Sequence, residues 1–470
     1  MGEDAAPRVR LAEASLRERA ARLRMPFRFG VATLREVRQA ELTVRIVAAD
    51  GRGAVGIAAE CLLPKWFDKN PALSDDDNVE QLRAALGIAL ELYSGLSADT
   101  PFGLSATVYR EQQARCAALG LNPLVASYGP ALVDRAILDA TGRMLGMSFS
   151  QMIRGNVAGI TVSSGLTEDL QGFDLAQFLG NLRPQDTIGV RHTVGMVDAL
   201  TASDPLEGPA DGLPQTLEDV VKTYGCRFYK LKAGGDIAAD LDRLTRIAAV
   251  LDVGPADYRA TLDGNEQYSD VEGIVELWRR MSETPALSRL CASTLYIEQP
   301  IRRAVALERE VGALAVLKPV MIDESDATLD AFPQAISLGY QGVSSKTCKG
   351  FYKSILNAAR IAKRNAALGE SRFFLSAEDL CTWAGISTQQ DLALVSLLGL
   401  THVERNGHHY LDGMSFAPED EQAAFLAAHG DLYHRPPGGP VRLAVANGSV
   451  RLKSLDCQGF AVGVPPVMGG

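Results

Sequence analysis

The stretch "RFYKLKAGGDIAADLDRLTRIAAVLD", residues 227–252, joins a short, mostly apolar strand to an amphipathic helix through a glycine pair. Apolar residues recur at spacings of three and four in "AADLDRLTRIAAVLD", which is typical of a helix that covers a sheet. The strand is unusual, because Lys230 and Lys232 interrupt an apolar run that a parallel sheet would bury on both faces. The stretch therefore predicts a βα unit whose strand carries two charges for a reason other than packing.

The same alternation of strands and helices continues from about residue 188 towards the C-terminus. Helical patterns such as "GIVELWRRMS" and "SILNAARIAKRN" separate the strands, and eight strands in this arrangement predict a closed barrel of the TIM type. The eight predicted strands are "IGVRHTVG", "RFYKLK", "YRATLDGN", "STLYIEQP", "PVMIDES", "QGVSSKT", "RFFLSAED" and "LTHVE".

The first 150 residues have a different pattern and predict a separate α+β unit. From about residue 25, "MPFRFGVATLREV" and "AELTVRIVAAD" are typical of strands, and "DGRGAVG" of a hairpin turn. The helical stretches "NVEQLRAALGIALELYSGL" and "GPALVDRAILDATGRMLGM" follow. Residues 157–187 fit neither pattern and are expected to be an insertion, and the strand-and-turn tail from residue 441 is expected to return to the first unit.

Composition and charge exclude several classes of partner. The 47 basic and 57 acidic residues give a net charge of −10 without any Lys/Arg-rich block, which argues against nucleic acid and anionic membranes as partners. No apolar run approaches ~18 residues, and the charged N-terminus does not resemble a signal peptide. Seven scattered cysteines without a C-x-x-C pair are typical of reduced thiols, so we expect a cytoplasmic protein.

Charged residues stand at the ends of five consecutive predicted barrel strands, where the catalytic groups of such barrels lie. Any one carboxylate could instead cap the helix that follows its strand, but caps need not fall on five strands in succession. Three converging carboxylates repel one another unless a cation neutralises them, and oxygen ligands suit Mg²⁺. We therefore assign three of them to a metal. The residues are Lys230 and Lys232 on strand two, Asp263 on strand three, Glu298 on strand four, Asp323 and Glu324 on strand five, and Lys346 on strand six, with Asp263, Glu298 and Asp323 as the metal ligands.

These residues make the chain resemble the enolase superfamily, within the mandelate racemase/muconate-lactonizing enzyme family and its muconate-lactonizing-type subgroup with paired lysine bases. The hallmark of that subgroup is K-x-K, D, E, D and K on strands two to six. The stretches of this chain that resemble it are, in the same order, "YKLK", "LDGN", "IEQP", "IDES" and "SSKTCK". The resemblance implies an α/β fold: a modified (β/α)8 barrel at 157–440 with an N-terminal α+β capping domain at 1–156, and a segment at 441–470 that returns to the cap. It also implies self-association into a homo-oligomer.

Two departures from the family pattern bear on the substrate pocket. The glycine pair usual after the strand-six lysine is replaced by "GFYKS", and "SAED" ends strand seven where the mandelate racemase subgroup carries a histidine. The missing histidine favours the two-lysine subgroup.

The chemistry that the resemblance implies is removal of the proton α to a substrate carboxylate. Mg²⁺, or Mn²⁺ as a substitute, would stabilise the enediolate, and Lys232 and Lys346 would act as bases on opposite faces of the α-carbon. Burial, the metal and the neighbouring Lys230 are expected to lower the pKa of Lys232, and Lys230 would help to hold the substrate carboxylate. Glu324 is expected to hydrogen-bond towards Lys346 or a metal-bound water, although a role at a helix start is an equal alternative.

Several functions remain open at this stage. A racemase or epimerase of an amino-acid-like or peptide-like carboxylate is favoured, and a cycloisomerase or dehydratase of a hydroxy or unsaturated acid is the first alternative. A Schiff-base lyase would leave the three carboxylates unexplained, and a silent binding protein would be free to lose them. Residues 24–33 are either a loop over the substrate or an ordinary strand. Arg191 and His192 either reach the insertion near the mouth or are structural.

Overall fold

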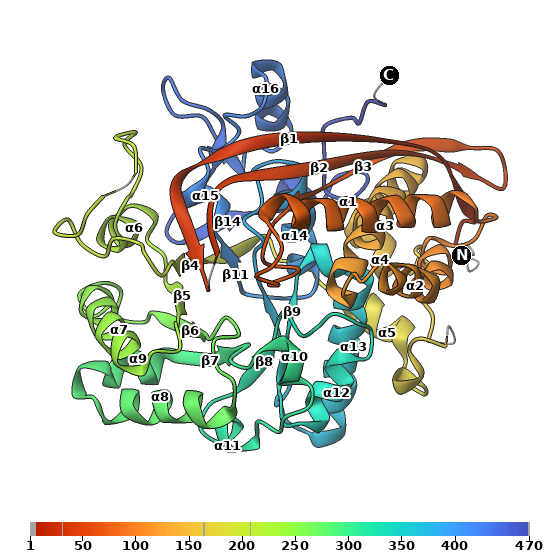
Figure 1. Ribbon diagram of the computed structural model, residues 1–470. Helices are drawn as coiled ribbons and strands as arrows, with labels where there is room; N and C mark the ends of the chain where they lie inside the picture. The colour runs from red at the N-terminus through yellow and green to blue at the C-terminus, as the bar shows by residue number, and fades with distance from the viewer. Residues whose placement is uncertain (1–5, 31, 163–164, 207, 469–470) are drawn as a thin grey trace.

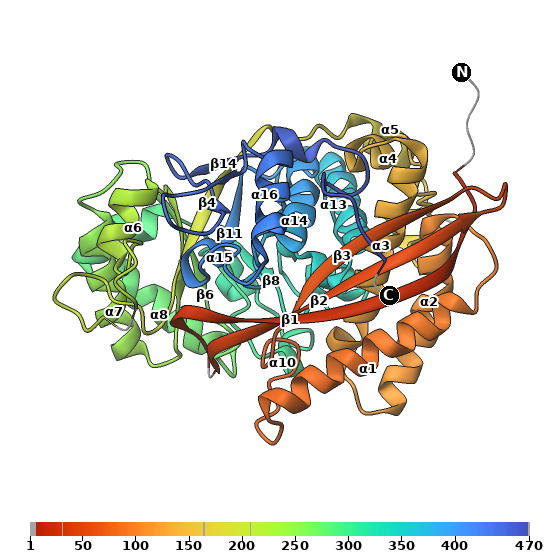
Figure 2. The same ribbon diagram turned by 90° about the horizontal axis from the view of Figure 1, so that it is seen from above.

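The computed structural model describes residues 6–30, 32–162, 165–206 and 208–468, so residues 1–5 of the charged N-terminus lie outside the described part. A barrel and a cap are recognisable in Figure 1, with the long strands β1 and β2 running across the top of the barrel towards the cap helices. The view from above shows the same hairpin crossing from the helices α1–α3 to the barrel strands (Figure 2).

The cap sheet is antiparallel, in the order β1-β2-β3, with bounds Val9–Phe29, Ala32–Ala48 and Gly53–Leu62. The expected hairpin between β2 and β3 is confirmed, but the expected start of the first strand near residue 25 is wrong. The stretch "MPFRFGVATLREV" instead holds the end of β1, the turn at Gly30 and the start of β2. Residues 9–24 lack apolar alternation because much of this edge strand faces solvent, and its pairing with β2 stabilises it.

Four helices complete the cap. A capping box between Ser74 and Asp77 starts the first of them, and Asn122 with Pro123 starts the third. The third helix packs directly on β3, because Gly56 has no side chain: a Cβ there would lie 2.3 Å from the carbonyl oxygen of Ala136. The helices are α1 (Asp75–Ser94), α2 (Pro101–Ala118), α3 (Pro123–Leu145) and α4 (Phe149–Arg154).

All eight strands predicted for the barrel are present, and the α/β fold with a barrel and an α+β cap is confirmed. Parallel ladders join them in the order β10-β9-β8-β7-β6-β5-β4-β11. Within the described residues no ladder joins β10 to β11. Two hydrogen bonds to side chains link the residues that follow these strands instead: the Asp379 N–H donates to the Glu404 carboxylate (2.9 Å), and the Asn406 N–H donates to the Asp379 carboxylate (2.6 Å). The strands are β4 (Thr187–Val194), β5 (Phe228–Lys232), β6 (Arg259–Asp263), β7 (Thr294–Glu298), β8 (Val320–Ile322), β9 (Gly342–Ser345), β10 (Phe374–Ala377) and β11 (His402–Arg405).

Helices of varied length surround this sheet and bury a continuous apolar core against it. No helix in the described part of the chain combines the length and apolar character needed to cross a membrane. The helices are α6 (Leu217–Tyr224), α7 (Ile237–Leu251), α8 (Val271–Glu283), η2 (Pro285–Leu287), α9 (Ser288–Ser293), α10 (Arg303–Ala306), α11 (Gly312–Ala315), α12 (Ala331–Ser337), η3 (Thr347–Lys349), α13 (Phe351–Leu368), α14 (Ile386–Leu397), α15 (Gly407–Tyr410) and α16 (Glu419–Ala428).

The stretch 157–187 leads from the cap into the barrel and carries η1 (Glu168–Leu170) and α5 (Leu175–Asn181). Asp169 pairs with Arg360 of α13 at 2.7 Å, so this stretch lies against the outer helices. The C-terminal part holds β12 (Tyr433–His434), β13 (Arg442–Leu443), β14 (Ser449–Arg451) and η4 (Lys453–Leu455). It touches both bodies: β14 pairs with β4, and Gln458 forms a bridge with Ser148. The division of the chain at residues 156 and 440 stays a prediction.

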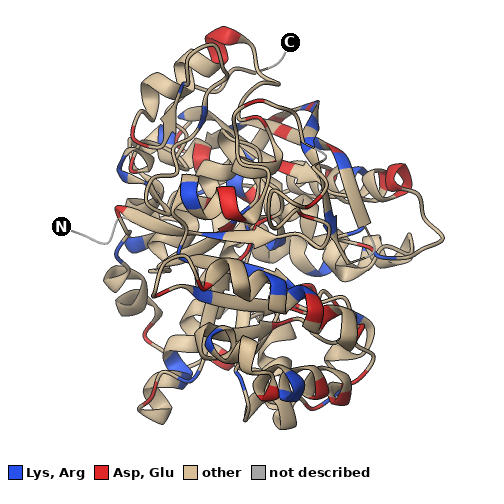
Figure 3. Ribbon diagram, turned by 90° about the vertical axis from the view of Figure 1, so that its left-hand side faces the viewer, with Lys and Arg blue, Asp and Glu red and all other residues tan. Residues whose placement is uncertain are grey.

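Charges of both signs are mixed over the molecule. Figure 3 shows lysine and arginine segments interspersed with aspartate and glutamate segments on the face turned to the viewer. Many exposed residues form local ion pairs, such as Arg279 with Glu276 and Glu283 on α8. This distribution agrees with the absence of a basic block in the sequence.

Candidate active site

The register of the barrel strands places the predicted site residues side by side. Lys232 is the partner of Asp263 across β5 and β6, and Asp263 is in turn the partner of Glu298 across β6 and β7. Asp323 directly follows β8, and Lys346 directly follows β9. Since the carboxyl ends of parallel strands meet at one edge, these residues share the mouth of the barrel.

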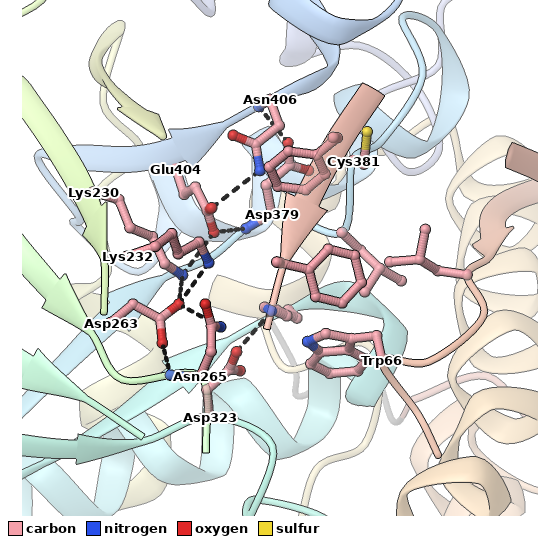
Figure 4. Close-up of a pocket in the computed structure, with 15 residues that line it drawn as sticks. Trp66, Lys230, Lys232, Asp263, Asn265, Asp323, Asp379, Cys381, Glu404 and Asn406 are labelled. Atoms are coloured by element: carbon pink, nitrogen blue, oxygen red, sulfur yellow. Dashed lines mark hydrogen bonds and ion pairs between the residues drawn. The ribbon is translucent and has the colours of Figure 1, made fainter. Parts of the chain in front are cut away.

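A pocket of about 350 Å³ lies at this mouth, between barrel and cap. Figure 4 shows Lys230, Lys232 and Asp263 on one side and Trp66 on the other. Phe27 and Phe29 at the end of β1 also line it, so residues 24–29 are part of a strand that reaches the site. The lining residues are Phe27, Phe29, Leu63, Trp66, Lys230, Lys232, Asp263, Asn265, Asp323, Lys346, Asp379, Leu380, Cys381, Glu404 and Asn406.

Lys230 is buried at the centre of an acidic cluster. Burial alone would lower the pKa of its ammonium group, but the surrounding negative charges raise that pKa well above its usual value. Its Nζ lies 2.7 Å from Glu298, 2.9 Å from Glu378, 3.1 Å from Glu404 and 3.1 Å from Asp263.

The other two lysines each contact a different carboxylate. Lys232 Nζ donates to Asp263 at 2.7 Å, and Lys346 Nζ donates to Asp323 at 2.7 Å. Lys346 Nζ also lies 4.2 Å from the centroid of the Trp66 ring. Burial acts to lower the pKa of Lys346, but the charge of Asp323 outweighs it and raises that pKa above its usual value. This direction is opposite to the one expected for a lysine base, because the acidic partner carries its full charge here.

The carboxylates only partly fit a bound Mg²⁺. Their oxygens are the right type of ligand, and Glu298 Oε2 is buried without a hydrogen-bond partner. Burial and the charges of Asp263, Glu378 and Asp323 raise the pKa of Glu298 well above its usual value, which shows that the acids are crowded together. Yet no group of three or more histidine, cysteine, aspartate or glutamate side chains among the described residues is arranged to hold a metal ion. Lysines occupy most of the carboxylate oxygens instead.

Glu324 lies beside the cap and contacts a residue that the sequence did not single out. Its Oε1 accepts a hydrogen bond from Lys69 at 3.3 Å, and Lys69 also pairs with Glu266. Burial raises the pKa of Glu324, although Lys69 opposes this shift. Glu324 thus joins the barrel to the cap, whereas the sequence predicted a hydrogen bond towards Lys346 or a metal-bound water, or a role at a helix start.

Several further residues at the site were missed, four of which contact the predicted ones from the barrel. Glu378 directly follows β10, Glu404 is the last residue but one of β11, and both contact Lys230. Lys349 donates to the backbone oxygen of Asp323 at 3.1 Å. Asn265 donates to Asp263 from its backbone at 2.8 Å and lines the pocket. The rule that charged residues at strand ends form the site would have found the two glutamates had it been extended to strands seven and eight.

Arg191 and His192 on β4 lie away from the pocket lining. Arg191 is fully buried and pairs with Glu378, so it supports the acidic cluster from behind. His192 packs against His409 with ring centroids 4.8 Å apart. No described residue of 157–187 lines the pocket, so neither side chain meets the insertion there.

Comparison with solved structures shows that the chain shares its fold with several enzymes that are at most 19% identical to it. No protein-family model matches the chain, and no curated protein matches it in sequence. A muconate lactonizing enzyme from Mycobacterium smegmatis, complexed with muconolactone, is similar with a TM-score of 0.58 and 16% identity over 97% of both chains. A dipeptide epimerase from Methylococcus capsulatus, complexed with Mg and L-Arg-D-Lys, has a TM-score of 0.56 and 19% identity over 94% of this chain and 99% of its own. An enolase from Bradyrhizobium, complexed with magnesium and mandelic acid, has a TM-score of 0.56 and 16% identity over 94% of this chain and 93% of its own.

Proposed function

We propose that this protein is a Mg²⁺-dependent enzyme that removes the proton α to a substrate carboxylate, and that it acts as a racemase or epimerase. The observation that carries the proposal is the placement of two lysines in one pocket. Lys232 at the end of β5 and Lys346 after β9 come from strands four places apart in the eight-strand order, so they face the pocket from opposite sides. A base on each face of one carbon permits inversion.

Asp263, Glu298 and Asp323 are proposed to hold the metal, with Mn²⁺ as a possible substitute. The unpartnered Glu298 Oε2 supports this assignment, and the structurally similar dipeptide epimerase and Bradyrhizobium enolase were both solved with magnesium. The bound metal would supply electrostatic stabilisation of the enediolate oxygens. Glu324 supports this side of the mouth through Lys69.

The side chains of Lys232 and Lys346 are proposed to transfer the α-proton of the substrate. In the structure both Lys232 and Lys346 donate to carboxylates. The charge of Asp323 holds the pKa of Lys346 above its usual value, so Lys346 becomes a base only when Asp323 is neutralised and burial lowers its pKa without opposition. Lys230, held by four carboxylates, stays charged and is suited to bind the substrate carboxylate.

The substrate we propose is an amino-acid-like or peptide-like carboxylate. We further propose that the protein forms a homo-oligomer and belongs to the muconate-lactonizing-type subgroup with paired lysine bases. The acidic groups Asp379 and Glu404 line the pocket on the side away from Asp323, which suits a substrate that also carries a positive charge. A cycloisomerase or dehydratase is the second candidate, supported by the similar fold of the muconate lactonizing enzyme. Such an enzyme would need only one of the two lysines as a base.

The test is α-proton exchange. The protein is incubated with Mg²⁺ in D₂O and pooled amino acids, dipeptides and hydroxy acids, and deuterium uptake is followed by NMR. We expect metal-dependent uptake into one acid, and loss of inversion in Lys232→Ala and in Lys346→Ala. Lys222→Ala, at an exposed position on α6, is the matched control and should retain full activity.

Two results would contradict the proposal in different ways. No exchange into any acid, together with no heat of Mg²⁺ binding, would favour a silent binding protein. Exchange that survives Lys346→Ala but not Lys232→Ala, without inversion in the wild type, would replace the epimerase with a one-base cycloisomerase or dehydratase.

A further inference from the structure

A second cavity lies between the cap helices α2 and α3 and the start of α13. Its walls are largely apolar. Among the described residues, none that lines this cavity also lines the candidate active site. The apolar lining includes Phe102, Ala106, Pro130, Leu329 and Leu356.

Gln112 presents an unpartnered acceptor in this cavity. Pro130 lacks an N–H, so the carbonyl of Ala126 has no helical donor, and Gln112 Nε2 donates to it at 3.1 Å. The same nitrogen donates to the carbonyl of Ala85 at 2.9 Å, which fixes the orientation of the amide. Gln112 is 1% exposed, and its Oε1 has no hydrogen-bond partner.

Tyr352 contributes a second unpartnered polar group. Its ring packs edge-on against Phe102, with centroids 5.2 Å apart, and the residue is 4% exposed. Tyr352 lines the cavity, and its hydroxyl is buried without a partner. A buried hydroxyl without a hydrogen bond is costly, so a ligand that supplies one gains affinity.

The ionisable groups at the cavity indicate an uncharged ligand. Asp134 accepts hydrogen bonds from the hydroxyls of Tyr93 (2.5 Å) and Ser105 (2.7 Å), and burial raises its pKa to about 7. Burial lowers the pKa of Lys353, which donates to the backbone oxygen of Asp326, to about 8. Because burial shifts an acid and a base alike towards their neutral forms, a charged ligand would also lose solvation here.

We propose that this cavity binds an uncharged small molecule that has an apolar body and a hydroxyl group, with the hydroxyl bonded to Tyr352. A second donor on a longer ligand would reach Gln112 Oε1. The cavity wall includes Lys349, whose Nζ also contacts Asp323, so the ligand would lie directly behind the candidate active site. This site is separate from the proposed activity and does not depend on it.

The test uses p-cresol as the probe and toluene, which lacks the hydroxyl, as its matched control. Calorimetry on the full chain should show saturable 1:1 binding of p-cresol that is about fivefold tighter than that of toluene. Tyr352→Phe, which removes only the hydroxyl, should abolish this preference. Ala106→Leu should block both probes by filling the cavity, whereas Ala423→Leu at an exposed position of α16 should change nothing.

The proposal is overturned if p-cresol shows no saturable binding, or if p-cresol and toluene bind equally well. Binding that is unchanged in Ala106→Leu would place the probe elsewhere and would equally overturn it. If Tyr352→Phe still binds p-cresol more tightly than toluene, the hydrogen bond assigned to the Tyr352 hydroxyl is wrong. Thermal melting of each variant shows whether a loss of binding reflects a loss of fold.

Discussion

Lys230 balances the negative charge of the carboxylates at the mouth of the barrel, and replacing it tests this charge balance. Lys230→Met keeps much of the side-chain length but leaves the buried Glu298, Glu378 and Glu404 without their shared cation. We expect a loss of about 3–5 kcal/mol in the free energy of unfolding, since breaking a buried ion pair leaves uncompensated charge. Urea unfolding at neutral pH measures it, with Lys222→Met on the exposed face of α6 as the control. Equal stability of Lys230→Met and wild type would contradict the charge balance described above.

Three histidines form a second buried cluster whose charge state controls stability. His192 lies between His408 and His409, with ring centroids 5.9 and 4.8 Å away, and Glu404, Arg405 and Arg24 are the charged groups that act on the cluster. Burial lowers the pKa of His192 to about 3 and lowers the pKa values of the other two well below the usual range. Each histidine is therefore neutral in the folded protein near neutral pH.

Acid should consequently destabilise the fold through these histidines. The unfolded chain takes up protons below its histidine pKa of ~6.5, whereas folded His192 stays neutral until about pH 3. Each histidine contributes its full stabilisation above a pH of ~6.5. As the pH decreases below that value, the free energy of unfolding falls by about 1.4 kcal/mol per pH unit for each histidine. His192→Gln should flatten the dependence of unfolding free energy on pH between about 6.5 and 5 by this amount, and His434→Asn, at an exposed position where burial lowers the histidine pKa less, should flatten it less. An unchanged slope in His192→Gln would show that the histidine is already charged when folded.

At the residue scale, the sequence predicted the part of the site that follows a rule of position. Lys232, Asp263 and Lys346 could be found because parallel strands bring their carboxyl ends together, whatever the loops do. Trp66 and Lys69 could not be found in this way. They come from a cap loop whose position depends on tertiary contacts with the barrel, and nothing local in "PKWFDKN" indicates that contact.

At the scale of elements, the predictions from sequence agreed best with the structure for the strands that are most deeply buried. The barrel strands are buried on both faces, so each is an apolar run between helices that sequence alone can identify. The first sixteen residues of β1 are largely exposed and charged, and their strand conformation comes from pairing with β2. Their sequence therefore gave no period-two signal.

Gly56 makes possible the close packing of α3 on β3, and two glycine substitutions test this. Gly56→Ala would place a Cβ 2.3 Å from backbone atoms of Ala136 and Ala140, so helix and sheet must separate. We expect a loss of about 2 kcal/mol or more in unfolding free energy. Gly87→Ala on the exposed face of α1 meets nothing within 4 Å and should stabilise the helix by about 0.5–1 kcal/mol. Thermal or urea unfolding distinguishes the two, and similar effects of both changes would contradict the packing role of Gly56.

At the scale of the whole molecule, Arg303 joins the two bodies beside the pocket. Its guanidinium donates to the backbone oxygens of Trp66 (2.8 Å) and Phe67 (3.0 Å) in the cap, and it pairs with Glu266 of the barrel at 2.7 Å. Lys69 reaches the same glutamate and also Glu324. The cap loop that carries Trp66 over Lys346 is thus held by charged contacts with the barrel rather than by its own sequence.

This arrangement predicts that Arg303→Met will release the cap loop while both bodies remain folded. Backbone amides of residues 63–70 should exchange with deuterium roughly tenfold faster or more, because a hydrogen bond to a charged group contributes about 1.5–3 kcal/mol. Exchange in the barrel strands β5–β7 should stay unchanged. Arg302→Met removes the exposed neighbouring arginine and is the matched control. If exchange at 63–70 were the same in both variants, the cap loop would be held by the apolar packing of Trp66 and Phe67, and the Lys346–Trp66 contact would not depend on Arg303.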